Sequence, residues 1–152
     1  MLSEIIKNIF SDPVLSLGIS AFYILLFALP FSLISTLRNK SSDFVKSLAI
    51  IANIFITLQL ISRWIISSHF PISNLFESLC FLSWGIILAQ LLLEREYQTP
   101  IISTLSIPLI LLTLGFACFV LPEDLRSSSN LVPALRSSWL VMHVSVVMLS
   151  YA

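Results

Sequence analysis

Four apolar stretches in this sequence are each long enough to cross a lipid bilayer. A helix needs about 20 predominantly apolar residues to span the hydrocarbon core. The stretches cover about residues 14–37, 45–66, 75–93 and 101–121. A fifth begins near Trp139 and reaches Ala152 after about 14 residues, which is too short to span. We therefore predict an all-α polytopic membrane protein with four transmembrane helices plus the start of a fifth.

Composition supports this class and excludes others. Hydrophobic residues make up 57% of the 152 residues and charged residues 11%, whereas a soluble domain carries about 25% charged residues. Eight basic residues balance eight acidic ones, so no basic surface attracts nucleic acid. Two cysteines cannot form a disulfide framework. We expect a single helical domain over residues 1–152, and the short fifth stretch predicts the N-terminal part of a longer protein.

Orientation depends mainly on the loop between the first two spans. This loop carries Arg38, Lys40 and Lys46, and basic loops favour the cytoplasmic side of a membrane, or the stromal side in a plastid. Alternation of the spans then places the region after Arg63 and the loop before Trp139 on the opposite, outer side. His69 and His143 are both predicted on that side.

Glu77 is an ionisable residue close to membrane depth, where a charge is costly. One interpretation is a capping box, in which Asn74 is the N-cap and Glu77 occupies the third helical position. The other is a polar pocket lined by Asn74, Glu77 and Ser78, which share one helix face. Phe81 and Trp84 continue that face deeper into the span.

Arg63 lies near the outer end of the second span and also has two interpretations. Its guanidinium can reach the membrane interface by extending along the helix. Alternatively, it pairs with Glu77 or with an anionic ligand such as a carboxylate. Cys80 and Cys118 are predicted at similar depths, where buried, unreactive thiols are favoured over a redox pair.

The two histidines are the candidate ligands for a metal or a haem, because neutral imidazole is the commonest axial haem ligand. His69 lies in the loop before the third span. His143 lies about one turn into the fifth stretch, on the same helix face as Trp139 and Met142. On composition alone, either histidine is more often a hydrogen-bonded structural residue.

Two longer stretches carry a resemblance to a known family. Residues 69–79 read HFPISNLFESL and are followed by FLSW at 81–84; residues 131–145 read LVPALRSSWLVMHVS. Both resemble signature segments of CcsA-type cytochrome c biogenesis proteins, and their spacing along the chain is similar to that of the family. The resemblance extends over essentially the whole chain.

The resemblance implies a function in the System II pathway. Such proteins work with a CcsB-type membrane partner to deliver haem b and present it for covalent attachment to apocytochrome c on the outer, lumenal side of a thylakoid membrane. His143 matches an external histidine that is an axial ligand of the haem iron in that family. His69, Asn74 and Glu77 match motif positions without an assigned role.

The resemblance also limits what this chain is expected to do. The tryptophan-rich segment and the second external histidine of the family have no counterpart within these 152 residues. We therefore expect part of a haem attachment complex that is inactive alone, in which His143 binds haem and Trp139, Glu77, Asn74, Arg63 and His69 are candidate pocket residues. The alternatives are a small-solute transporter or channel subunit lined by Arg63, Glu77 and His69, or a structural membrane subunit.

Overall fold

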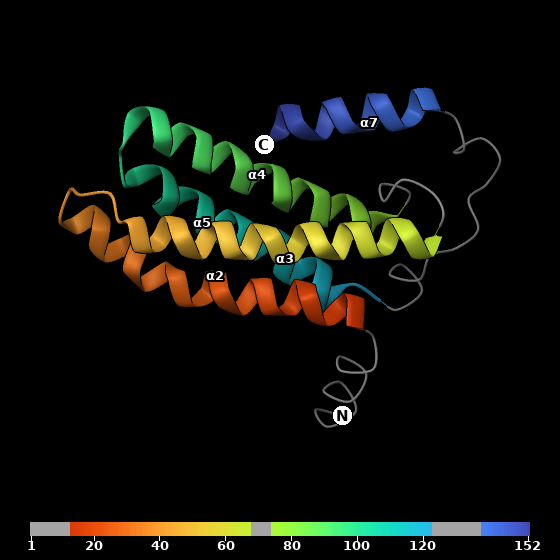
Figure 1. Cartoon of the computed structure of the whole chain (residues 1–152), viewed down its shortest axis with the longest axis horizontal. Helices are drawn as coiled ribbons and strands as arrows, with labels where there is room; N and C mark the ends of the chain where they lie inside the picture. Colours follow the sequence, from red (N-terminus) through yellow and green to blue (C-terminus); the bar gives the residue numbers. More distant parts are fainter. Residues whose placement is uncertain (1–12, 68–73, 123–137) are drawn as a thin grey trace.

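The computed structural model describes residues 13–67, 74–122 and 138–152, all of which form helices or short connections. Figure 1 shows the elements in chain order. They are α2 (Pro13–Leu37), α3 (Asp43–Ser67), α4 (Leu75–Tyr97), α5 (Ile101–Gly115), a five-residue π-helix η1 (Phe116–Val120) that continues α5, and α7 (Ser138–Tyr151). The predicted all-α class is confirmed.

Four of these helical segments have the length and composition of membrane spans. They are Val14–Leu37, Asp43–Ile66, Leu75–Tyr97 and Ile101–Val120. At about 1.5 Å per residue, each is about as long as the hydrocarbon core is thick. Helix α7 is a shorter apolar helix, as expected for the fifth stretch. The predicted multi-pass arrangement is therefore confirmed, with each span within a few residues of the predicted one.

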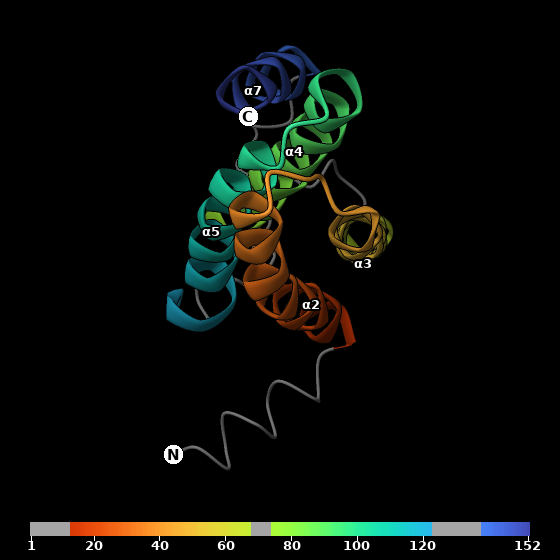
Figure 2. The same cartoon turned by 90° about the vertical axis from the view of Figure 1, so that its left-hand side faces the viewer.

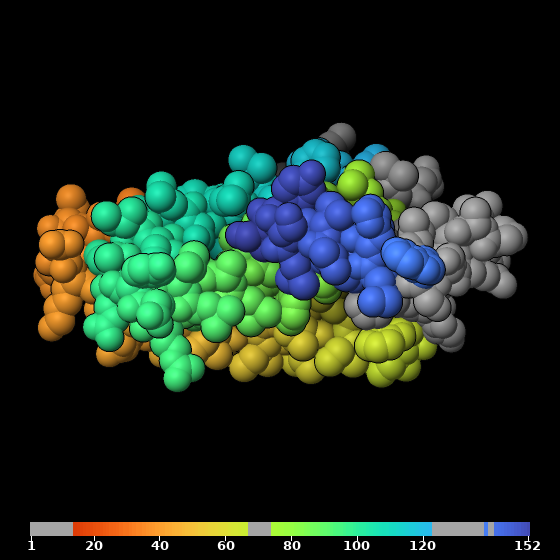
Figure 3. Space-filling model, turned by 90° about the horizontal axis from the view of Figure 1, so that it is seen from above, coloured from red at the N-terminus to blue at the C-terminus, as the bar shows by residue number. Residues whose placement is uncertain are grey.

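The four spans form one bundle, and α7 packs beside it. Helix α2 contacts α3 and α5, whereas α4 contacts α3, α5 and α7. Viewed along the bundle, α7 lies beside α4 on the side away from α2 (Figure 2). The space-filling view shows α7 as a ridge over α4 (Figure 3).

The two ends of the bundle differ in what they carry. Helix α3 ends, and α4 and α7 begin, at the right-hand end in Figure 1, which we call the rim end. The α2–α3 and α4–α5 connections lie at the opposite end, which we call the loop end. The loop end carries the basic residues that predicted the cytoplasmic or stromal side.

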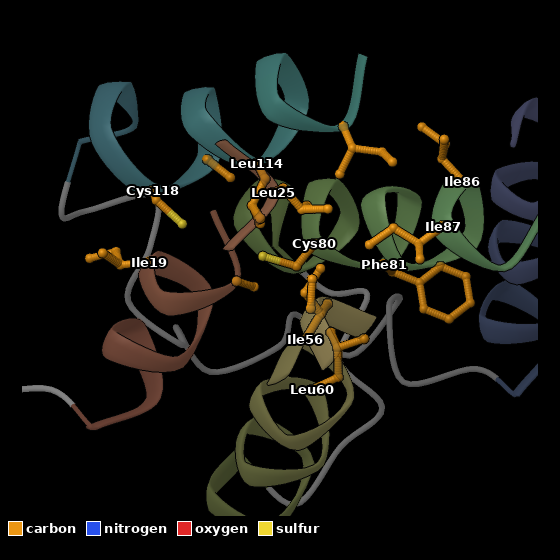
Figure 4. Packing of buried hydrophobic residues seen from close by; sticks show 14 of the residues in the cluster. Ile19, Leu25, Ile56, Leu60, Cys80, Phe81, Ile86, Ile87, Leu114 and Cys118 are labelled. Atoms are coloured by element: carbon orange, nitrogen blue, oxygen red, sulfur yellow. The ribbon is translucent and has the colours of Figure 1, made fainter. Parts of the chain in front are cut away.

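Small residues let the helices approach closely. Ala21, Ala28, Ala49 and Ala52 are fully buried, and a side chain at Gly18 would meet the Gln59 amide at 2.6 Å. Small residues are enriched at helix contacts in membranes because packing, not exclusion from water, drives association there. Larger side chains such as Leu25, Ile56 and Leu114 fill the remaining core (Figure 4).

Hydroxyl groups and one indole connect the helices by hydrogen bonds. The Trp84 Nε1 donates to Thr57 Oγ1 at 2.9 Å and joins α4 to α3. Ser83 Oγ and Thr113 Oγ1 lie 2.8 Å apart and join α4 to α5. Thr36 and Thr104 make the equivalent contact between α2 and α5 at 2.6 Å. These bonds fix the register of each helix pair.

The contribution of the Trp84–Thr57 hydrogen bond to the stability of the bundle can be measured. We expect Trp84→Phe and Thr57→Val each to destabilise the bundle, with a coupling of about 0.6 kcal/mol between them, the average for hydrogen bonds between membrane helices. A double-mutant cycle on unfolding in detergent measures this coupling. The cycle removes the separate packing cost of each substitution. Fully additive single effects would contradict the bond.

Candidate functional site

A buried ion pair joins α3 and α4 at the rim end. Arg63 Nη1 lies 3.8 Å from Glu77 Oε1, and the two side chains are 15% and 1% exposed. Arg63 comes from the last turns of α3, and Glu77 comes from the first turn of α4. A carboxylate near a helix N-terminus is further stabilised by the helix dipole. Of the two interpretations of Arg63, pairing with Glu77 is therefore the one the geometry supports.

The Asn74 side-chain bond that a capping box requires does not form. Asn74 is the N-cap residue of α4 with an extended backbone, but its side chain makes no capping hydrogen bond. Glu77 does occupy the third helical position, yet its carboxylate turns toward α3. Glu77 therefore makes a contact between helices, which the local motif alone does not reveal.

One aromatic side chain contacts the pair, and two more lie deeper along α4. The Arg63 guanidinium lies over the Phe76 ring, 4.8 Å from its centroid, which is cation–π geometry. One to two turns deeper, Phe81 and Trp84 stack with their ring centroids 5.5 Å apart. Phe81 and Trp84, which the sequence placed on the same face as Glu77, thus pack against each other. The indole N–H of Trp84 is already used in the hydrogen bond to Thr57.

The two cysteines lie in the core. Cys80 is three residues after Glu77 in α4, and Cys118 lies in η1. Cys80 and Cys118 are free and buried, and Figure 4 shows them on α4 and η1 in the same part of the core. Both belong to the same cluster of buried core residues. They are therefore packed core residues, as the sequence favoured.

His143 lies on an exposed face of α7. It is five residues from Ser138, where α7 begins, which places it about 8 Å along the helix from the rim end. Met142 and Trp139 are also exposed, at 69% and 82%. On the other side of α7, Met148 packs against the core, and near the end of the helix a side chain at Gly85 of α4 would meet Leu149 and Ala152. The face shared by Trp139, Met142 and His143 is therefore open.

The candidate pocket residues are only partly brought together. Arg63 and Glu77 are in contact, Asn74 is three residues before Glu77, and His143 and Trp139 occupy a different helix at the same end. His69 lies outside the described residues. Within 13–67, 74–122 and 138–152, no three or more His, Cys, Asp or Glu side chains are grouped to hold a metal ion. A haem iron with an axial imidazole does not require such a group.

Two buried polar residues near the loop end were not predicted. Helix α4 extends to Tyr97, beyond the predicted end of the third span near residue 93, and Gln90 and Glu94 are each 1% exposed. A signal was present in the sequence. Phe76, Cys80, Ser83 and Ile87 are spaced three and four residues apart on the buried stripe, and Gln90 and Glu94 continue that spacing.

The Arg63–Glu77 ion pair leads to a specific prediction about the stability of the helix bundle. Removing one partner of a buried pair leaves an uncompensated charge, at a cost of about 3–5 kcal/mol. We expect Glu77→Gln to destabilise the bundle by this order, and Glu77→Gln combined with Arg63→Gln to recover part of the loss. Unfolding in detergent measures both, with Glu96→Gln as the exposed control on the same helix. A double variant as unstable as the sum of the single ones would contradict the pairing.

Comparison with known proteins places the chain in a family. The family model for the cytochrome C assembly protein matches residues 72–152, more than half of the chain. The protein named cytochrome c biogenesis protein CcsA from Prochlorococcus marinus subsp. pastoris is 69% identical over 147 residues, 97% of this chain and 47% of that protein. Its namesake from Prochlorococcus marinus strain AS9601 is 64% identical over 152 residues, 100% of this chain and 49% of that protein.

The chain thus spans about half the length of the curated relatives it matches. The matched region of the family model contains α4, α5, η1 and α7, together with the Glu77 and His143 positions. The relatives extend the match through α2 and α3. The chain belongs to the cytochrome c assembly protein family.

Proposed function

We propose that this chain is part of a membrane protein that presents haem for covalent attachment to apocytochrome c. Membership of the cytochrome c assembly family and the names of the relatives support this function. They do not favour the transporter or structural subunit that the sequence left open. The haem is cargo in this proposal, delivered to the outer side of the membrane and passed on to the apocytochrome.

The exposed imidazole of His143 is the observation that carries the proposal. A side chain that binds haem for transfer to another protein must be accessible, and His143 lies on the open face of α7. Trp139, one turn nearer the rim end, adds an exposed aromatic surface. An imidazole beside a flat apolar surface suits one axial position of a haem. These residues therefore fit the cargo.

His143 and Trp139 have different roles in this proposal. The neutral imidazole nitrogen of His143 binds the haem iron and fixes its position, while the indole of Trp139 covers apolar macrocycle surface. Attachment itself forms thioether bonds between the haem vinyl groups and the apocytochrome cysteines, so the chain contributes orientation and protection rather than a reacting group.

The ion pair at the rim end has a supporting role. Arg63 and Glu77 join the ends of α3 and α4 on either side of the segment that contains His69. Helix α4 in turn carries α7. We propose that the pair holds this end of the bundle in a fixed arrangement, so that the His143 face is presented in one orientation.

The partners and location follow from the same family. We propose that a CcsB-type membrane protein completes the assembly, that the cargo is haem b, and that the rim end with His143 faces the lumen of a thylakoid. The relatives from Prochlorococcus and the basic residues at the loop end support this orientation.

Substitution of His143 tests the proposal. In a protein of the length of the curated relatives, with this chain as its first part, we expect His143→Ala to lower the yield of holocytochrome c at least tenfold and to weaken the Soret band of the purified protein. Added imidazole should restore part of the yield, because it can occupy the vacated axial position. Both are measured by haem staining and absorption spectroscopy.

Val146→Ala is the matched control, since Val146 is also exposed on α7 and lacks a ligating atom. We expect it to leave the yield and the spectrum unchanged. Normal holocytochrome yield in His143→Ala would remove His143 from the mechanism. A longer protein that stays free of haem even when haem is supplied would overturn the proposed function.

A further inference from the structure

The loop end of the bundle contains a buried polar group that haem presentation does not use. Glu94 and Gln90 lie one turn apart on the same face of α4, and each is 1% exposed. They are at the opposite end of α4 from Glu77, so they are remote from the His143 face (Figure 1). Their burial at the end of a membrane span requires an explanation, because each polar group left without a partner there is costly.

Several oxygen and nitrogen atoms of this group have no hydrogen-bond partner among the residues that the structure describes. They are Glu94 Oε2 and both Gln90 amide atoms, Oε1 and Nε2. The Glu94 carboxyl interacts with Ser103, which is 2% exposed at the start of α5. The Ser103 hydroxyl donates to the carbonyl of Pro100 at 3.0 Å. Two acceptor oxygens on one helix face are thus left over, one from a carboxylate and one from an amide.

The electrostatic surroundings of Glu94 combine a basic side chain with the end of its own helix. Glu94 interacts electrostatically with Lys46, but the Lys46 ammonium also lies 3.9 Å from the Asp43 carboxylate. Lys46 thus lies near two acidic side chains, of which Asp43 is fully exposed and Glu94 is buried. Glu94 is also in the last turn of α4, and its own carbonyl accepts from the cap residue Gln98. The negative end of the helix dipole therefore lies close to the site.

We propose that Glu94 and Gln90 bind a small monovalent cation, with sodium as the probe. Hard cations prefer oxygen ligands, and Glu94 Oε2 and Gln90 Oε1 are the oxygens that lack a partner. A divalent ion fits less well, because Glu94 provides a single negative charge and Lys46 lies near it. Both ligands come from α4, so the bound cation lies on this face of the helix.

Sodium-dependent stability of the detergent-purified chain tests this site. A ligand that binds the folded state raises Tm by mass action. We expect sodium chloride to raise Tm by about 4 °C over choline chloride at equal ionic strength, if the salt is about tenfold above the Kd. Broadening of the sodium-23 NMR line by the protein gives a direct measure of binding that does not depend on unfolding.

Glu94→Gln removes the charged ligand and should abolish both the sodium-dependent Tm shift and the line broadening. Glu96→Gln makes the same chemical change two residues away on an exposed position and should retain both. If Glu94→Gln does not fold, Gln90→Met tests the site through the second ligand and should weaken binding at least tenfold. Equal Tm values in sodium and choline with an unchanged line width, or full sodium binding by Glu94→Gln, would overturn the proposal.

Discussion

The absence of water from the bilayer core is the constraint on which the rest of the structure depends. Each backbone N–H and C=O must find its partner within the chain, which only helices and closed barrels achieve. The hydroxyl side chains obey the same constraint. Ser20, Thr57 and Ser83 donate to carbonyls four residues earlier in their own helices, and Ser83 also reaches Thr113 on α5. These hydroxyl groups therefore satisfy their own donors within a helix, and Ser83 also connects two helices.

The two buried carboxylates of α4 show how differently the same constraint can be met. Glu77 lies in the first turn, where the helix dipole stabilises a negative charge, and Arg63 approaches it from α3. Glu94 lies in the last turn, where the dipole opposes a negative charge, and shares Lys46 with Asp43. Glu77 thus has a basic partner from the neighbouring helix, whereas Glu94 shares its basic neighbour with an exposed carboxylate.

Much of the fold could be predicted because a membrane span is defined by local composition. The four predicted spans appear within a few residues, and the largest difference is at the end of α4. The predicted span stopped near residue 93 because Glu94, Arg95 and Glu96 follow it. The helix nevertheless continues to Tyr97, since backbone hydrogen bonding does not end where hydropathy falls. Burial of Glu94 then depends on α5, whose position no local pattern reveals.

The candidate site, like the fold, could be predicted from the sequence only in part. The sequence by itself determined the helices, their approximate ends and the positions that resemble the family, including His143 near the start of α7, because these depend on local order and spacing. Only the tertiary structure decided that Glu77 pairs with Arg63, that the Asn74 side chain makes no capping bond, and which helices enclose Gln90 and Glu94. These outcomes depend on which helices pack together, and packing between distant segments is set by shape and charge across the whole bundle.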